Sequence, residues 1–246
     1  MPLPKISVPH YTIELPSTGQ EIKFRPFLVR EEKLLVLALE SEDTKEITTA
    51  MKTVLKNCIE TKGIKVETLP TFDIEYLFLN IRAKSVGEDI EVNIICPDDG
   101  ETEVPVTISV DDIKVTKNEN HTRKIKVDEN IMMEMKYPSL DQFIKNNFDI
   151  AAQNNIDQSF DLIASCIDKI YTEDEAWSAS DVTKKELMEF LDQMNKAQFD
   201  QIETFFDTMP KLSHTIKVTN PNTKKESEVV LEGLASFFSW VWVIWT

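Results

Sequence analysis

The sequence predicts an α+β fold, in which a helical body carries β-hairpins and ribbons and no single continuous sheet. Two observations lead to this class. Apolar residues recur at helical spacing in some stretches, and in others they alternate with polar residues beside turn signals. The composition, with 41% hydrophobic residues and five glycines, is typical of a folded chain. Helices are predicted at 29–40, 45–61, 72–84, 139–150, 156–171, 183–194 and 195–208.

The N-terminal segment, residues 1–88, is predicted to form a hairpin followed by three helices. Apolar and polar residues alternate from Tyr11 to Leu15, the turn sequence Pro-Ser-Thr-Gly follows, and apolar residues return between Ile22 and Phe27. The acidic pair Glu31-Glu32 favours a helix start in 29–40, because negative charge stabilises helix N-termini. Gly63 is expected to end the second helix, and the third is expected to stop near Gly87.

Residues 89–137 change to the period of strands. Two strands between 90 and 115 are joined by Pro97-Asp-Asp-Gly100, where proline fixes φ and glycine accepts a positive φ. A second strand pair is predicted at 124–135. The last segment, 213–246, repeats the first ribbon in outline, and placing Cys96-Pro97 over Asn220-Pro221 aligns Asp99 with Thr223. The chain therefore divides into four contiguous segments, 1–88, 89–137, 138–212 and 213–246, of which 138–212 is an acidic helical region. Together these segments are expected to form one or two compact units.

The two ribbons resemble zinc-ribbon knuckles that have lost their ligands. A structural zinc site takes four soft ligands, normally one Cys-x-x-Cys pair from each knuckle. The corresponding positions here are Cys96, Asp99, Asn220 and Thr223, and one thiolate of four cannot hold the metal. We therefore predict plain hairpins with a buried cysteine, and neither a metal nor another cofactor.

Sequence features typical of catalysis are weak. The three histidines, His10, His121 and His214, are isolated and stand in no recognised catalytic motif, so structural or surface roles are favoured. The acidic stretches 173–175 and 186–192 lack the ligand order and central glycine of a calcium loop. The sequence thus predicts a protein that is not an enzyme. A metal-stabilised enzyme or binding module built on the two ribbons stays open as the alternative.

Charge and cysteine content limit the partners and the compartment. The formal net charge is −16, with 43 acidic and 27 basic residues, and such a surface repels nucleic acid and anionic lipid. Three separated cysteines and no secretory signal at the N-terminus favour a reducing cytoplasm without disulfides. No apolar run reaches the roughly 18 residues that a membrane-spanning helix needs.

The chain ends on SFFSWVWVIWT, which holds three of its four tryptophans. Alternation of Trp and Val there fits an extended strand that adds to a sheet edge, and aromatic side chains often dominate binding energy at interfaces. Docking on the chain's own sheet and docking on a partner are equal alternatives, and a peripheral membrane contact is opposed by the negative charge. The candidate partner-binding residues are Phe237, Phe238, Trp240, Trp242 and Trp245.

Several stretches together resemble a known family. LPSTGQEIKFRPFLVREEKLLVLA, MKYPSLDQF, FDLIASCIDKIY, ELMEFLDQMNKAQFDQIETFFDTMPKLSH and LEGLASFF are similar to the base plate protein family of T-even-like contractile-tailed phages. This family includes a baseplate hub subunit and hub-assembly proteins, and the resemblance runs from about Tyr11 to Phe238.

The resemblance implies a role in virion assembly with other baseplate hub proteins as partners. The protein would act in the cytoplasm of the infected host, either as a hub subunit that stays in the tail baseplate or as an assembly chaperone that leaves. Homo-oligomerisation stays open, and the run Trp240–Trp245 lies beyond the part that can be matched.

Overall fold

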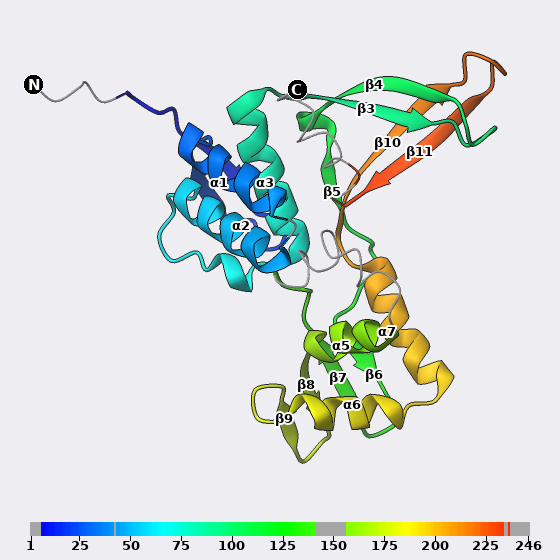
Figure 1. The fold of residues 1–246 in the computed structure, drawn as a ribbon. Coiled ribbons are helices and arrows are strands. Elements are labelled where there is room, and N and C mark those ends of the chain that lie inside the picture. Colours follow the sequence, from blue (N-terminus) through cyan, green and yellow to red (C-terminus); the bar gives the residue numbers. More distant parts are fainter. Residues whose placement is uncertain (1–5, 42, 141–155, 234–235, 237–246) are drawn as a thin grey trace, which may run out of the picture. The chain divides into compact units, whose positions relative to one another are not determined.

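The computed structural model describes residues 6–41, 43–140, 156–233 and 236, and it confirms the α+β class. The chain forms two compact units, the first made of residues 1–116 and 211–246 and the second of residues 117–210 (Figure 1). The first unit is therefore discontinuous in sequence. The four contiguous segments stay a prediction about sequence pattern, since the units group the chain differently.

The predicted N-terminal hairpin is confirmed in the first unit. Strands β1 (Tyr11–Glu14) and β2 (Glu21–Phe24) pair antiparallel, with Tyr11 opposite Phe24. The alternate side chains Ile22 and Phe24 are buried, as the period-2 pattern requires. A tight turn closes the hairpin, where the Gly19 amide donates to the Leu15 carbonyl (2.8 Å).

Three helices follow, α1 (Val29–Glu40), α2 (Thr44–Cys58) and α3 (Thr71–Val86), with a short 3₁₀ turn, η1 (Val66–Thr68), before α3. The Asp43 side chain caps α2 by accepting from the amides of the first turn. Helix α2 ends three residues before the predicted 61, because Ile59 pairs with Phe24 and the Glu60 amide donates to the Lys23 carbonyl (2.8 Å). A sheet contact thus replaces the last predicted helical turn.

Helix α3 lies at the centre of the first unit. It presents apolar side chains around most of its circumference, unlike a surface helix with a single apolar stripe. Gly87, with a φ of 134°, caps its C-terminus, close to the predicted stop. The buried apolar residues of α3 are Phe72, Ile74, Leu77, Phe78, Leu79, Ile81 and Ala83.

The two ribbons of the first unit are confirmed as hairpins. Strand β3 (Asp89–Ile95) pairs with β4 (Glu103–Ser109), and β10 (Lys211–Thr219) pairs with β11 (Glu226–Glu232). After the 3₁₀ turn η2 (Val110–Asp112), a further strand, β5 (Lys114–Thr116), joins β10 to give the order β11-β10-β5. This pairing joins segments almost a hundred residues apart, and local periodicity does not reveal it.

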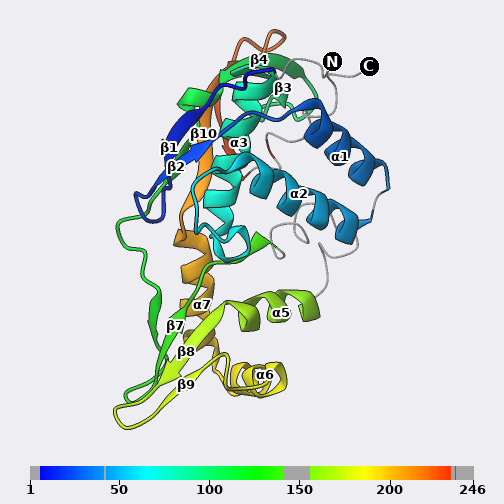
Figure 2. The ribbon, with the colours of Figure 1, turned by 90° about the vertical axis from the view of Figure 1, so that its left-hand side faces the viewer.

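The second unit is a four-stranded antiparallel sheet in the order β6-β7-β8-β9. The strands are β6 (Lys124–Lys126), β7 (Met132–Met135), β8 (Ile167–Tyr171) and β9 (Ala176–Ser178). Helices α5 (Ile156–Cys166), α6 (Lys184–Asp192) and α7 (Lys196–Thr208) lie on one face of this sheet (Figures 1 and 2). The core between helices and sheet includes Met133, Met135, Cys166, Ile167, Leu191, Ile202 and Phe205.

The predicted helix 156–171 is wrong in its last five residues, which form strand β8. Ile167, Ile170 and Tyr171 are β-branched or aromatic residues that pack well on a sheet, and Ile170 pairs with Met133 of β7. Strand β9 was not predicted at all. The apolar pattern continues past Cys166 without a break. A buried strand and a buried helix can share such a pattern, so the sequence did not reveal where the helix ends and the strand begins.

The helices predicted at 183–194 and 195–208 are confirmed with slightly later starts. Each begins with a capping box, Thr183 with Glu186 in α6 and Asn195 with Gln198 in α7. The predicted helix 139–150 lies outside the described residues from 141 onward. Among the residues that the structure describes, no helix is long and apolar enough to cross a membrane.

Candidate functional site

The turns of the two ribbons share one local geometry. In the first, the Gly100 amide donates to the Cys96 carbonyl, and in the second the Lys224 amide donates to the Asn220 carbonyl, both at 2.9 Å. Gly100 has a φ of 70° and Lys224 a φ of 62°, so both turns end in the left-handed region. The predicted correspondence between the two ribbons is therefore confirmed at the level of the turns.

These two turns contact each other through polar side chains. The Asn220 amide nitrogen donates to Asp98 Oδ1 (3.0 Å) and to Asp99 Oδ2 (2.7 Å), and the Thr223 hydroxyl donates to Asp98 Oδ2. Asn220 is 1% exposed, and its own Oδ1 accepts from the backbone amides of Asn222 and Thr223. We call Asp98, Asp99, Asn220 and Thr223 the turn clasp.

The turn clasp brings three of the four predicted knuckle positions into one hydrogen-bond network. Cys96, the fourth, begins its turn as a buried residue and donates its amide to the Thr102 carbonyl (2.8 Å). Asp98 was missed, because the knuckle spacing drew attention only to Asp99. The adjacent pair Asp98-Asp99 was the available signal, since both carboxylates accept from the same Asn220 side chain.

Hydrogen bonds hold the clasp carboxylates in their charged form. The Thr102 hydroxyl and backbone amides, with Asn220, keep the pKa of Asp99 well below its usual range, and Thr223 and Asn220 lower the pKa of Asp98. Burial and the neighbouring carboxylates raise the pKa of the Cys96 thiol. Within the described ranges, no group of three or more His, Cys, Asp or Glu side chains could hold a metal ion. The clasp therefore joins two ribbons with neutral donors and charged acceptors.

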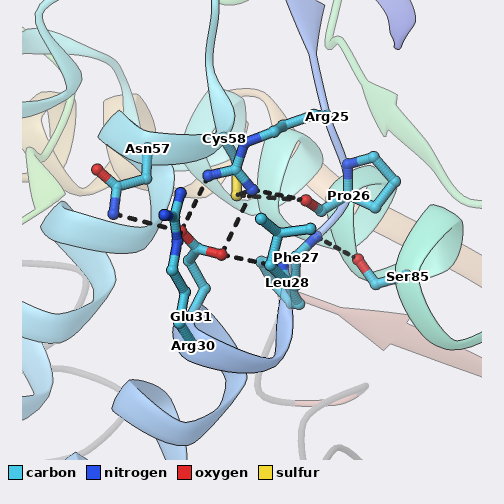
Figure 3. Close-up of polar contacts among 9 residues, drawn as sticks. All are labelled: Arg25, Pro26, Phe27, Leu28, Arg30, Glu31, Asn57, Cys58 and Ser85. Atoms are coloured by element: carbon cyan, nitrogen blue, oxygen red, sulfur yellow. Dashed lines mark hydrogen bonds and ion pairs between the residues drawn. The ribbon is translucent and has the colours of Figure 1, made fainter. Parts of the chain in front are cut away.

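A buried ion pair lies between the first hairpin and helices α1 and α2 (Figure 3). Arg25 Nη2 donates to Glu31 Oε1 (2.9 Å), and Arg25 Nη1 donates to the Pro26 carbonyl (2.9 Å). Glu31, 1% exposed, also accepts from Arg30 Nε (2.7 Å) and from the Leu28 amide (3.0 Å). The Glu31 carboxylate thus caps the start of α1 and ties it to the residue after β2.

The contacts around Glu31 decide its ionisation. Burial alone would raise the pKa of its carboxyl, but the bonds from Arg25, Arg30 and the Leu28 amide lower that pKa to about 2. Cys58, at the end of α2, lies 3.8 Å from Arg25 Nη1, and burial raises the pKa of its thiol to about 12. Sequence reasoning placed Glu31 at a helix start but missed its pairing with Arg25.

The three histidines are not brought together into one site. His10 Nδ1 lies 2.8 Å from Glu60 Oε2 at an exposed position of the first unit, and His214 is half-buried on β10. His121 belongs to the second unit, where it stacks on the Tyr137 ring and lies tilted against the Phe205 ring. Structural roles fit these surroundings.

His121 is held as a neutral imidazole. Its Nδ1 lies 3.0 Å from the Thr208 hydroxyl and its Nε2 lies 3.0 Å from the Tyr137 hydroxyl. Because the Thr208 hydroxyl donates to the Thr204 carbonyl, it accepts from Nδ1–H, and Nε2 then accepts from Tyr137. Burial and the nearby Arg123 lower the pKa of His121.

Protonation of His121 is expected to destabilise the second unit. Its folded pKa lies below the unfolded value of about 6.5, so its contribution is complete above pH 6.5 and is lost as the pH falls through the folded pKa. Thermal melts between pH 8 and pH 5 should show a falling midpoint in this window. A His121→Gln variant should melt lower at pH 8 and lose that part of the slope, and an unchanged slope would contradict the assignment.

The acidic stretches have separate structural places. Glu186 closes the capping box of α6, where its carboxylate accepts from the Thr183 amide and hydroxyl. Residues 173–175 form the exposed turn between β8 and β9. The aromatic residues proposed for partner binding, Phe237, Phe238, Trp240, Trp242 and Trp245, lie outside the described residues.

Helix α1 presents an exposed face with large apolar side chains. Val29 is 80% exposed, Leu37 53% and Leu34 36%. These residues recur at positions that share one side of a helix, with Arg30 and Lys33 between them. The face was not singled out from the sequence, because the leucines of 29–40 indicated one apolar side of a helix and not which of them would be exposed.

Comparison with known proteins identifies the family. The sequence matches the family described as T4 bacteriophage base plate protein over residues 8–239. The chain belongs to this family. The match includes both ribbons, the buried ion pair and the whole second unit, so it covers nearly every described residue. No curated protein and no solved structure matches the chain.

Membership in the baseplate family defines the broad role. The family gives the chain a structural role in the phage baseplate, with other phage baseplate proteins as its partners and the virion tail as the structure to which that role belongs. The α+β fold described above is therefore that of a baseplate protein.

Proposed function

We propose that this baseplate protein is a non-enzymatic component of the baseplate hub, either a hub subunit or a hub-assembly chaperone. The family match over residues 8–239 carries the proposal, because it spans both units and leaves little of the chain for a separate activity. The mechanism is recognition of other hub proteins in the host cytoplasm. The sequence resemblance to hub proteins supports the hub over other parts of the baseplate.

The exposed face of α1 supports a mechanism based on recognition. Val29, Leu34 and Leu37 place apolar surface in solvent on one side of a helix. Contiguous exposed apolar surface on a folded protein often marks a protein-docking site. The net charge of −16 keeps the free protein soluble and disfavours contacts with other acidic surfaces.

The C-terminal aromatic residues are proposed as an anchor for a hub partner. Trp and Phe give large contact areas and typical hot-spot energies in protein interfaces. The proposed anchor residues are Phe237, Phe238, Trp240, Trp242 and Trp245.

A pull-down from infected cells tests the proposal. Tagged full-length protein and a truncation ending at Phe238 would be compared for recovery of hub proteins identified by mass spectrometry. The full-length protein should recover them, and the truncation should recover at least about tenfold less if the Trp240–Trp245 run anchors a partner. Equal recovery by both would remove the anchor role alone, whereas failure of the full-length protein to capture any hub protein would contradict the hub role.

Mass spectrometry of purified virions separates the two forms of the proposal. A hub subunit should be present in a fixed ratio to the other baseplate proteins. An assembly chaperone should be absent or far below that ratio, although it is recovered with hub proteins from infected cells.

A further inference from the structure

A row of apolar side chains crosses the sheet of the second unit and ends at one edge on a side chain that is partly exposed. Cross-strand pairing places Ile125, Met133, Ile170 and Trp177 side by side, one on each of β6, β7, β8 and β9. The first three are buried, but Trp177 is 40% exposed. Because β9 is the edge strand of this sheet among the described residues, the row ends there on a tryptophan.

The backbone of β9 points hydrogen-bonding groups away from the sheet. The Thr172 amide donates to the Glu175 carbonyl (2.8 Å) and the Ala179 amide donates to the Asp168 carbonyl (2.9 Å). Hydrogen-bonded pairs alternate in an antiparallel ladder, so Trp177 bonds toward β8 while Ala176 and Ser178 point outward. The Ser178 carbonyl accepts from the Asp181 amide (2.9 Å), and this leaves the Ser178 amide at the edge.

The opposite edge, β6, has the same geometry with complementary chemistry. Backbone bonds pair Arg123 with Met135 and Val127 with Ile131, so the backbone groups of Lys124 and Lys126 point outward. Both lysines are exposed and flank the apolar Ile125. The Lys124 amide donates to the Thr122 hydroxyl (3.1 Å), a local contact that an incoming strand can replace.

Charge distinguishes the two edge strands, because β6 itself carries Lys124 and Lys126, and the exposed acids Asp128 and Glu129 come only after it, in the turn to β7. Glu173, Asp174 and Glu175 precede β9 and Asp181 follows it, all of them exposed. In the part of the chain that the structure describes, no ion pair includes these four acids. Two lysines close to these acids in sequence or register have other partners, since Lys184 pairs with Asp161 (2.6 Å) and Lys169 lies over the Tyr171 ring.

We infer that β9 of one molecule is the docking edge for β6 of a second copy. The added strand places Ile125 of the second copy beside Trp177 and continues the apolar row from one sheet into the next. Its two lysines, one on each side of Ile125, meet the acids at the two ends of β9. Because two different edges meet, the contact is head-to-tail and each copy keeps one edge for a further neighbour. This inference does not depend on the hub role.

A charge-exchange experiment on the full-length protein tests the inference. One variant carries Glu173→Lys, Asp174→Lys and Glu175→Lys, which leaves Asp181 as the one acid of the four, and another carries Lys124→Glu with Lys126→Glu. Each variant alone then has two edges of the same sign, whereas a mixture of the two restores opposite signs at the contact. Wild-type protein should show a mass average that rises above the 28.3 kDa of one chain with concentration, up to about 100 µM, in sedimentation or light scattering.

The expected result is loss of association in each variant alone, by about tenfold or more, and recovery on mixing. Recovery on mixing cannot come from a variant that has simply failed to fold. A wild-type protein that stays monomeric, or variants that associate as the wild type does, would overturn the inference. Failure to recover association on mixing would also overturn it, while capture of hub proteins in the pull-down would be unaffected.

A proline at the edge gives a second, backbone-specific test. Ser178→Pro removes the outward amide of β9, whereas Ser178→Ala removes only the hydroxyl and is the matched control. Self-association should weaken in the proline variant and persist in the alanine variant. Equal association of the two would show that β9 does not accept a strand.

Discussion

Replacing Glu31 with alanine is expected to lower the free energy of unfolding by about 3–5 kcal/mol, the largest effect of any single substitution considered. The change removes the partner of Arg25 and leaves its guanidinium buried without the carboxylate that it bonds at 2.9 Å (Figure 3). It also removes the acceptor for the Leu28 amide at the start of α1. Urea denaturation, followed by circular dichroism, measures the loss.

A double variant separates burial of an unpaired charge from loss of packing. Arg25→Met with Glu31→Leu removes both charges and keeps apolar volume, so it should recover much of the stability lost in Glu31→Ala.

The Arg25–Glu31 pair should also make the free energy of unfolding fall at acid pH. Because the folded pKa of Glu31 is about 2 and its unfolded value is 4.5, the stabilisation is complete above pH 4.5 and is lost as the pH falls toward 2. A stability loss below 1 kcal/mol in Glu31→Ala would contradict this account of the pair.

Replacing Asn220 with alanine is expected to cost about 2–3 kcal/mol and to separate the two ribbons. Asn220 is buried, and its side chain donates to Asp98 and Asp99 while it accepts from two backbone amides of its own turn. Hydrogen exchange should show faster opening at the amides of both turns, although the substitution lies in only one of them. Unfolding by urea gives the energy.

Two further variants sharpen this test of the turn clasp. Asn222→Ala removes an exposed bond to Thr102 and should cost less than about 0.5–1 kcal/mol, as surface changes usually do. Asn220→Asp keeps the size but faces two carboxylates, so it should be more destabilising than Asn220→Ala at pH 7 and recover as the pH falls. Equal stability of Asn220→Ala and Asn222→Ala would show that the clasp does not join the ribbons.

The fold was predictable where its signals are local. Turn sequences such as Pro97-Asp-Asp-Gly100 fix hairpins within a few residues, and the capping residues Thr183 and Asn195 start helices by bonding their own first turn. Strands β5 and β8 depend on partners distant in sequence, β10 and β7. Ile167–Tyr171 becomes a strand because β7 lies beside it, and this neighbour is not encoded in the local pattern.

The sequence indicated which residues of the two turns correspond to one another, but not which hydrogen bonds they make. Aligning two X-Pro turns indicated that Asp99, Asn220 and Thr223 correspond to knuckle positions, and the structure places them in one network. The role of Asn220 as a buried donor depends on the approach of two hairpins, which spacing cannot give. The pairing of Arg25 with Glu31 likewise needs the hairpin and α1 to meet, and charge patterning along a single helix does not show it.

The most direct test of the proposed hub role is electron microscopy of the tail structures made by a phage deprived of this protein. Cells infected with such a phage should accumulate tail components without complete baseplate hubs, and expression of the wild-type chain from a plasmid should restore them. Complete contractile tails and normal infectious yield in the absence of the protein would contradict the hub role.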